Sequence, residues 1–142
     1  IIVKSSQLKG INVPNSIIPN IIDEIPILSV AASFADGQTT IKNAFELKVK
    51  ESDRLHSTSM GLKAMNISHD LLDDGLVING TQDDVEIHEE IESFGDHRIA
   101  MSFLIAGLRS KNGVKVRDCS NIDTSFPNFS KIMNNLGMHI NE

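Results

Sequence analysis

Charged side chains gather in three short clusters that could hold and transform an anionic substrate. The clusters are Asp23-Glu24-Ile25-Pro26, Lys50-Glu51-Ser52-Asp53-Arg54 and Asp96-His97-Arg98. A positioned carboxylate can take or give a proton, and an arginine can grip a phosphate or a carboxylate at two points. These residue types therefore suit acid–base chemistry on an anion that is held by cations.

Each cluster stands at the start of a predicted helix. The spacing of apolar residues predicts helices over residues 23–34, 52–65, 96–109 and 126–136. We expect strands over residues 39–43, near 67, and over 76–78, 85–88, 114–116 and 138–140. Helix starts carry unpaired backbone N–H groups and the positive end of the helix dipole, so they bind phosphate or carboxylate readily.

A purely structural explanation remains open for every cluster. Asp23 and Asp96 could each be only a helix N-cap, and residues 50–54 could be a solvated helix start capped by Ser52 or Asp53. However, an arginine in a first helical turn opposes the helix dipole. Arg54 and Arg98 both do so, which indicates that their charge has another purpose.

The order of elements restarts halfway along the chain, which indicates a duplicated unit. A shift of 73 residues lays Asp23 on Asp96 and Ser52 on Ser125. We therefore expect an α/β (α+β) fold with repeat units at 23–82 and 83–142. Residues 1–22 are interpreted as the end of a preceding unit, a strand followed by an irregular connection.

Composition excludes several classes of partner. The net charge of −6 over 142 residues argues against nucleic acid. No uninterrupted apolar run reaches the ~18 residues of a membrane span. The single Cys119 fits a reducing cytoplasm, and no Cys/His spacing indicates a metal site. The first residue is Ile1 rather than Met, and we expect that a longer chain continues upstream.

Taken in order, the motifs resemble those of the 5-enolpyruvylshikimate-3-phosphate synthase family. The matching segments are residues 23–26, 49–55, 96–101 and 124–127. The resemblance extends over essentially the whole chain. It implies a longer two-domain enzyme, monomeric at full length, in which each domain is an inside-out α/β barrel of three βαβαββ units. These residues resemble the last two units of the domain that contains the C-terminus.

The resemblance also implies an activity. The family belongs to the shikimate pathway, which leads to chorismate and the aromatic amino acids. It transfers the enolpyruvyl group of phosphoenolpyruvate to the 5-hydroxyl of shikimate 3-phosphate and releases phosphate, without an organic cofactor or a metal. The expected partners are these two substrates and the missing N-terminal part of the same chain.

Two catalytic residues are carried over from the family. Asp23 matches the carboxylate that contacts the shikimate hydroxyl and takes its proton. Glu51 matches the acid–base residue that serves the methylene carbon of phosphoenolpyruvate. A glutamate protonates carbon best when its pKa is raised toward the working pH.

The family pattern also implies residues that bind the substrates. Lys50 matches the cation between the two substrates, and Arg54 and Arg98 match the arginines that bind phosphoenolpyruvate. Asp96 and His97 match residues that support this site. One position departs from the pattern: some members carry a lysine, which reaches the leaving phosphate, where this chain has Thr124.

Two other functions remain open at this stage. The chain could be a non-catalytic fragment that acts as a binding module, or it could belong to the related UDP-N-acetylglucosamine enolpyruvyl transferases. The segments at 50–55 and 96–101 favour the shikimate enzyme. We expect no turnover by this chain alone, because the residues that clasp the shikimate phosphate in the family lie in the missing part.

Overall fold

The computed structural model describes residues 2 and 4–141, and its mixture of helices and strands confirms the α/β class. In chain order the elements are η1 (Asn15–Ile17), α1 (Ile18–Ile21), η2 (Ile22–Glu24), α2 (Ile25–Ser33), β1 (Gln38–Ile41), η3 (Phe45–Val49), α3 (Arg54–Ala64), β2 (His69–Leu72), β3 (Gly75–Asn79), β4 (Ile91–Glu92), α4 (His97–Ala106), η4 (Gly107–Arg109), β5 (Val116–Arg117), α5 (Ile122–Ser125) and α6 (Phe129–Asn135). Elements marked η are 3₁₀ helices.

The first half of the chain forms an antiparallel sheet with the strand order β1-β3-β2. Residues 8–13 run parallel to the outer side of β1, with Gly10 N–H donating to Asp36 O at 2.7 Å and Val13 N–H to Thr40 O at 2.9 Å. These contacts are isolated bridges, so residues 8–13 extend the edge of the sheet without forming a strand of their own. The proposed boundary at residue 22 stays a prediction, and Ile1 and Val3 lie outside the described residues.

The second half contains a smaller sheet, in which β4 pairs with β5 in parallel. The strand predicted over 85–88 is wrong apart from one bridge between Val85 and Ser110. Ile87 N–H donates instead to the side chain of Asn112, at 2.9 Å, so a side chain takes the place of a neighbouring strand.

The strand predicted over 138–140 is also wrong, for the same physical reason. The side chain of Asn134 binds both backbone groups of Ile140, accepting from its N–H at 2.7 Å and donating to its carbonyl at 3.1 Å. The strand predicted near residue 67 begins later, at His69, because Ile67 N–H donates to Leu62 O and closes the end of α3.

All four predicted helices are present, as α2, α3, α4 and α6, and each begins one to three residues after its predicted start. Residues 15–21, predicted to be irregular, form the short helices η1 and α1. The stretch Asn15–Ser33 has a mean hydropathy of 1.2 and could cross a membrane by length and composition alone. A buried core helix passes the same test, and α2 packs against α3, α4 and β3.

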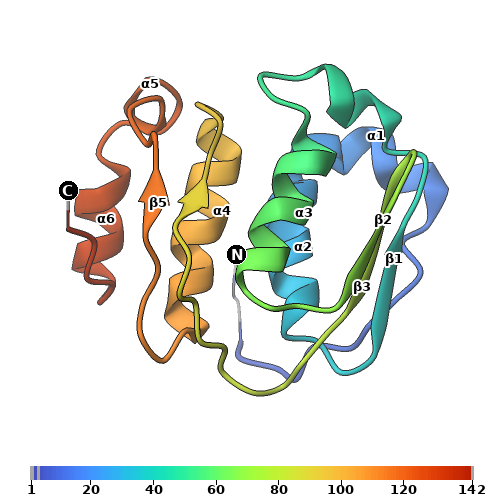
Figure 1. Cartoon of the computed structure of the whole chain (residues 1–142), viewed down its shortest axis with the longest axis horizontal. Coiled ribbons are helices and arrows are strands. Elements are labelled where there is room, and N and C mark those ends of the chain that lie inside the picture. Colours follow the sequence, from blue (N-terminus) through green and yellow to red (C-terminus); the bar gives the residue numbers. More distant parts are fainter. Residues whose placement is uncertain (1, 3, 142) are drawn as a thin grey trace.

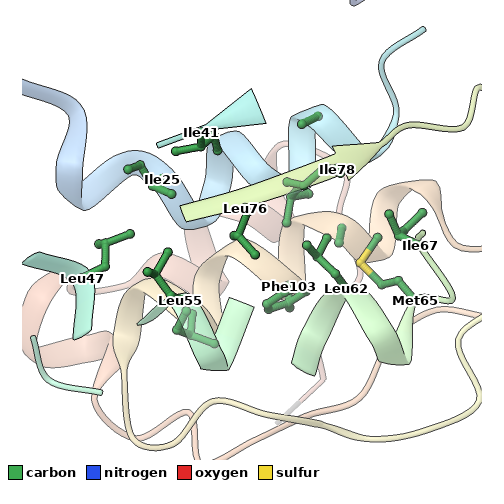
Figure 2. Close-up of a cluster of buried hydrophobic side chains, with 14 of the residues drawn as sticks. Ile25, Ile41, Leu47, Leu55, Leu62, Met65, Ile67, Leu76, Ile78 and Phe103 are labelled. Atoms are coloured by element: carbon green, nitrogen blue, oxygen red, sulfur yellow. The ribbon is translucent and has the colours of Figure 1, made fainter. Parts of the chain in front are cut away.

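The main core lies where α2, α3 and α4 meet one another and the three-stranded sheet (Figure 1). Figure 2 shows the buried side chains of this core, which come from both halves of the chain. At its centre the ring of Phe103 on α4 packs against Gly61 on α3. A Cβ added at Gly61 would lie 2.0 Å from the ring, so only glycine lets the two helices approach this closely.

We predict that Gly61→Ala lowers the free energy of unfolding by about 1–3 kcal/mol, because the added methyl group overpacks the contact with Phe103. Chemical denaturation measures this loss. The double variant Gly61→Ala/Phe103→Leu should lose less free energy of unfolding than the two single variants lose in sum, since a smaller side chain at 103 relieves the overlap. If the two losses in free energy of unfolding were strictly additive, the methyl group at 61 and the side chain at 103 would not overlap.

Candidate active site

The three charged clusters meet at one end of the helical layer. Figure 1 shows that α2, α3 and α4 begin at the same end of the molecule. The first cluster lies in η2 and the start of α2, the second connects η3 to α3, and the third opens α4. Charged side chains that are distant in sequence therefore come into contact above the core.

Arg54 is at the centre of this arrangement. Its side chain is only 2% exposed although it carries a full charge. Nη1 donates to Asp23 Oδ1 at 2.9 Å, and Nη2 donates to Glu51 Oε2 at 2.6 Å. Nε donates to Asp96 Oδ2 at 2.7 Å, with a longer bond of 3.3 Å from Nη2 to Oδ1 of the same residue. Three carboxylates thus surround one guanidinium.

Asp96 combines a capping role with this ion pair. Its Oδ1 accepts from the backbone N–H of Arg98 at 2.9 Å and of Ile99 at 3.4 Å, so it caps α4 as the simple explanation requires. It is also completely buried and holds Arg54. The capping explanation is therefore correct but incomplete for Asp96.

Asp23 does not cap a helix. It lies inside η2, and Glu24 occupies the N-cap position of α2 without a side-chain capping bond. Asp23 Oδ1 receives Arg54 and also lies 3.4 Å from Lys50 Nζ. Because 40% of its side chain is exposed, the carboxylate is accessible from outside.

The remaining predicted cations lie at the edge of the cluster. Lys50 Nζ donates to Glu46 Oε1 at 2.5 Å in addition to its contact with Asp23. Arg98 Nη1 donates to Asp23 O at 3.0 Å and to Glu24 Oε1 at 2.8 Å. The same end of the molecule therefore holds three cations and their partner carboxylates.

Glu51 and His97 are held by fewer partners than the other residues of the site. The side chain of Glu51 is 53% exposed and is held by Arg54 alone among the described ion pairs. His97 is half-buried at the first position of α4, and its imidazole has no hydrogen-bond partner within the described ranges 2 and 4–141. Thr124 lies in α5, where its hydroxyl donates to Asn121 O at 2.7 Å.

Neighbouring cations and hydrogen bonds lower the pKa of both the accessible Asp23 and the buried Asp96. Burial alone would raise the pKa of Asp23, but the hydrogen bond and charge of Lys50 and the charges of Arg98 and Arg54 bring it below the ordinary value. Burial likewise opposes ionisation of Asp96, and its bonds with Arg54, the Arg98 N–H and Ser52 lower its pKa in the same way.

Sequence reasoning did not identify two members of this network. Glu46 pairs with Lys50 at the i,i+4 spacing that joins side chains on one helical face, and that spacing was a usable signal. Ser52 was considered only as a possible cap, yet its hydroxyl donates to Asp96 Oδ2 at 3.1 Å, while Asp53 caps α3. No pattern in the sequence indicated the contact between Ser52 and Asp96, which lie 44 residues apart.

The arrangement of carboxylates and cations suits proton transfer beside a bound anion. Within residues 2 and 4–141, no group of three His, Cys, Asp or Glu side chains could hold a metal ion. A cavity of about 940 Å³, lined in part by His88, Leu104 and His139, contains none of the predicted site residues. The charged cluster and that cavity are therefore separate places in the structure.

Comparison with known proteins gives a consistent result along the whole chain. A family model for EPSP synthase (3-phosphoshikimate 1-carboxyvinyltransferase) matches residues 1–133. The 3-phosphoshikimate 1-carboxyvinyltransferase of Magnetococcus marinus is 47% identical over 140 residues, which cover 99% of this chain and 32% of the relative. That of Coxiella burnetii is 42% identical over 140 residues, with 99% and 31% covered.

A solved structure shows the same likeness in three dimensions. EPSP synthase from Acinetobacter baumannii matches with a TM-score of 0.90 at 42% identity, over 95% of this chain and 32% of that chain. The chain thus spans about a third of the length of the relatives that it matches. On the family match and these likenesses together, the chain belongs to the EPSP synthase family.

Proposed function

We propose that this chain is the part of a 3-phosphoshikimate 1-carboxyvinyltransferase that carries its proton-transfer residues and two of its substrate-binding arginines. The full reaction would transfer the enolpyruvyl group of phosphoenolpyruvate to the 5-hydroxyl of shikimate 3-phosphate and release phosphate. The observation that carries the proposal is the convergence of Asp23, Glu51 and Asp96 on the single buried guanidinium of Arg54.

Asp23 would remove the proton from the attacking hydroxyl. Its lowered pKa leaves it ionised at neutral pH, so it can accept a proton, and its exposure allows an alcohol to reach it. Lys50, next to it, would stabilise negative charge that develops between the two substrates. His97 would support the site from the start of α4.

Arg54 and Arg98 would bind the phosphoenolpyruvate anion. Four bonds already engage the Arg54 guanidinium, which has five N–H groups. An anion can gain a strong contact only if a carboxylate leaves, and the exposed Glu51 is the one held by Arg54 alone. Its departure would also free Glu51 to exchange a proton with the methylene carbon.

The charge balance supports a need for residues outside this chain. Three cations stand among the carboxylates Asp23, Glu24, Glu46, Glu51 and Asp96. Both proposed substrates are multiply charged anions, so a site with an excess of negative charge cannot hold them without additional cations. We therefore propose that this chain alone is inactive and that the rest of a longer chain completes the site.

The setting of the enzyme follows from the same proposal. We place it in the cytoplasm as a soluble, monomeric enzyme at full length that acts without cofactor, nucleic acid or membrane. The negative net charge and the biosynthetic activity named for its relatives support this setting. The related transferase for UDP-N-acetylglucosamine has no support among the relatives described above, all of which are named for the shikimate reaction.

The proposed function is tested with a chimera in which this chain replaces the aligned 140 residues of the Magnetococcus marinus enzyme. A coupled phosphate-release assay should show turnover with shikimate 3-phosphate and none with UDP-N-acetylglucosamine, and the 142-residue chain alone should show neither. A folded chimera without turnover would favour a non-catalytic binding module.

We predict opposite effects of Glu51→Gln on turnover and on binding in the chimera. Turnover should fall by roughly 10²-fold or more, because a general acid–base is lost. Phosphoenolpyruvate should bind roughly tenfold more tightly, because Arg54 no longer has to release an internal carboxylate. Calorimetry measures the affinity, and Glu46→Gln, which removes the same charge without touching Arg54, should change it by only about twofold.

We predict that Arg98→Ala raises the KM for phosphoenolpyruvate by roughly 10- to 100-fold, the worth of a charge-assisted hydrogen bond to the anion. The KM for shikimate 3-phosphate should change little. Arg117→Ala is the matched control, since Arg117 is exposed and pairs only with Glu90 among the described residues. An unchanged phosphoenolpyruvate KM would remove Arg98 from the binding site.

A further inference from the structure

We propose that Asp96 is a positioning residue that sets the spacing between Arg54 and Arg98 for a single anionic ligand. The inference rests on the proposed function, because it takes that ligand to be phosphoenolpyruvate. It assigns Asp96 no contact with substrate. Its role is to fix the two groups that do make contact.

The Asp96 carboxylate binds two helix starts through its two oxygens. Oδ2 accepts from Arg54 Nε at 2.7 Å and from the Ser52 hydroxyl at 3.1 Å, which ties it to the start of α3. Oδ1 accepts from the backbone N–H of Arg98 at 2.9 Å, which ties it to the first turn of α4. One planar group therefore fixes where the Arg54 guanidinium lies relative to the backbone that carries Arg98.

The Asp96 contact is fully buried, unlike the other carboxylate contacts of Arg54. Asp96 is completely buried, whereas the side chains of Asp23 and Glu51 are 40% and 53% exposed. Removing one partner of a buried ion pair leaves the other charge unpaired, which is strongly unfavourable. The exposed carboxylates can thus turn away from Arg54 when a ligand arrives, while Asp96 keeps the guanidinium in place.

Asp96 binds one edge of the Arg54 guanidinium, so the opposite edge is left for a ligand. Asp96 engages Nε and one proton of Nη2, and the remaining Nη groups face Asp23 and Glu51. Arg98 Nη1 lies on the same side, bound to the carbonyl of Asp23. Both arginines therefore converge near Asp23, and precise placement of such groups governs their contribution to binding and rate.

Asp53 provides an internal comparison. It is also an N-cap aspartate, on α3, and its side chain accepts from the His56 N–H at 3.1 Å. It is exposed and has no ion pair with an arginine in the described part of the chain. Because asparagine caps helices as well as aspartate does, Asp→Asn at the two positions separates capping from positioning.

The first measurement uses the 142-residue chain, with hydrogen exchange at Arg54 Nε followed by NMR. In the native chain and in Asp53→Asn, the Nε–H should exchange slowly because a buried carboxylate holds it. In Asp96→Asn its exchange should be at least about tenfold faster, since the charged partner is gone. Equal exchange rates in the two variants would overturn the proposal whatever reaction the protein catalyses.

The second measurement uses the Magnetococcus chimera. Asp96→Asn should raise the KM for phosphoenolpyruvate by about tenfold and change that for shikimate 3-phosphate by less than about twofold, because only the arginine spacing is disturbed. Asp53→Asn should change neither. Equal increases in both KM values, or no increase, would overturn the proposal. A parent chimera without turnover would count against the proposed function, and the exchange measurement would then decide the role of Asp96.

Ser52→Ala provides a milder variant in case Asp96→Asn does not fold. It removes one hydrogen bond to Asp96 Oδ2 and leaves the charge in place. We expect Arg54 Nε to exchange about two- to threefold faster and the phosphoenolpyruvate KM to rise by a similar factor. No change in either quantity would contradict the positioning role.

Discussion

The site depends on one buried guanidinium. Arg54 is almost inaccessible to water, and an unpaired charge in that position would be prohibitively unfavourable. Its partners are the carboxylates of Asp23 in η2, of Glu51 three residues before α3 begins, and of Asp96 directly before α4. The need to pair this charge therefore draws together segments that lie up to 42 residues away in the sequence.

Two of those carboxylates occupy matching positions in the repeat that the sequence predicts. Asp23 and Asp96 are related by the shift of 73 residues, and both bind Arg54. The same shift lays Arg54 on Pro127, so the second copy lacks the matching arginine. The two carboxylates lie in different environments, Asp96 completely buried and Asp23 40% exposed, which supports the proposal that Asp96 holds the arginine and Asp23 takes part in proton transfer.

The sequence was sufficient to predict the helices, because apolar spacing and polar starts are local properties. It also placed β1 and β3 closely, whereas β2 begins at His69 and not near residue 67. It failed at residues 85–88 and 138–140, where the side chains of Asn112 and Asn134 bind backbone groups that a neighbouring strand would otherwise take. The Asn112 contact joins residues 25 apart and depends on the tertiary fold, whereas the Asn134 contact spans only six residues but breaks the strand with a side chain that apolar spacing does not register.

The sequence indicated most of the charged residues that the structure brings together, but not Glu46, Ser52 or the contacts among them. Charged residues at three helix starts indicated the members, and the resemblance to a family implied their roles. What the sequence could not reveal is that Arg54 is already engaged by carboxylates of its own chain. That engagement changes the physical picture of binding, because an incoming anion exchanges with an internal carboxylate instead of meeting a free cation.

The excess of carboxylates around this site has a further consequence. A cluster with more negative than positive side chains repels a free anion at long range, yet the arginines can bind one strongly at short range once a carboxylate moves aside. Such a site favours an anion only when further positive charge approaches with it. The same balance of charges supports the proposal that residues of a longer chain complete the site for an anion.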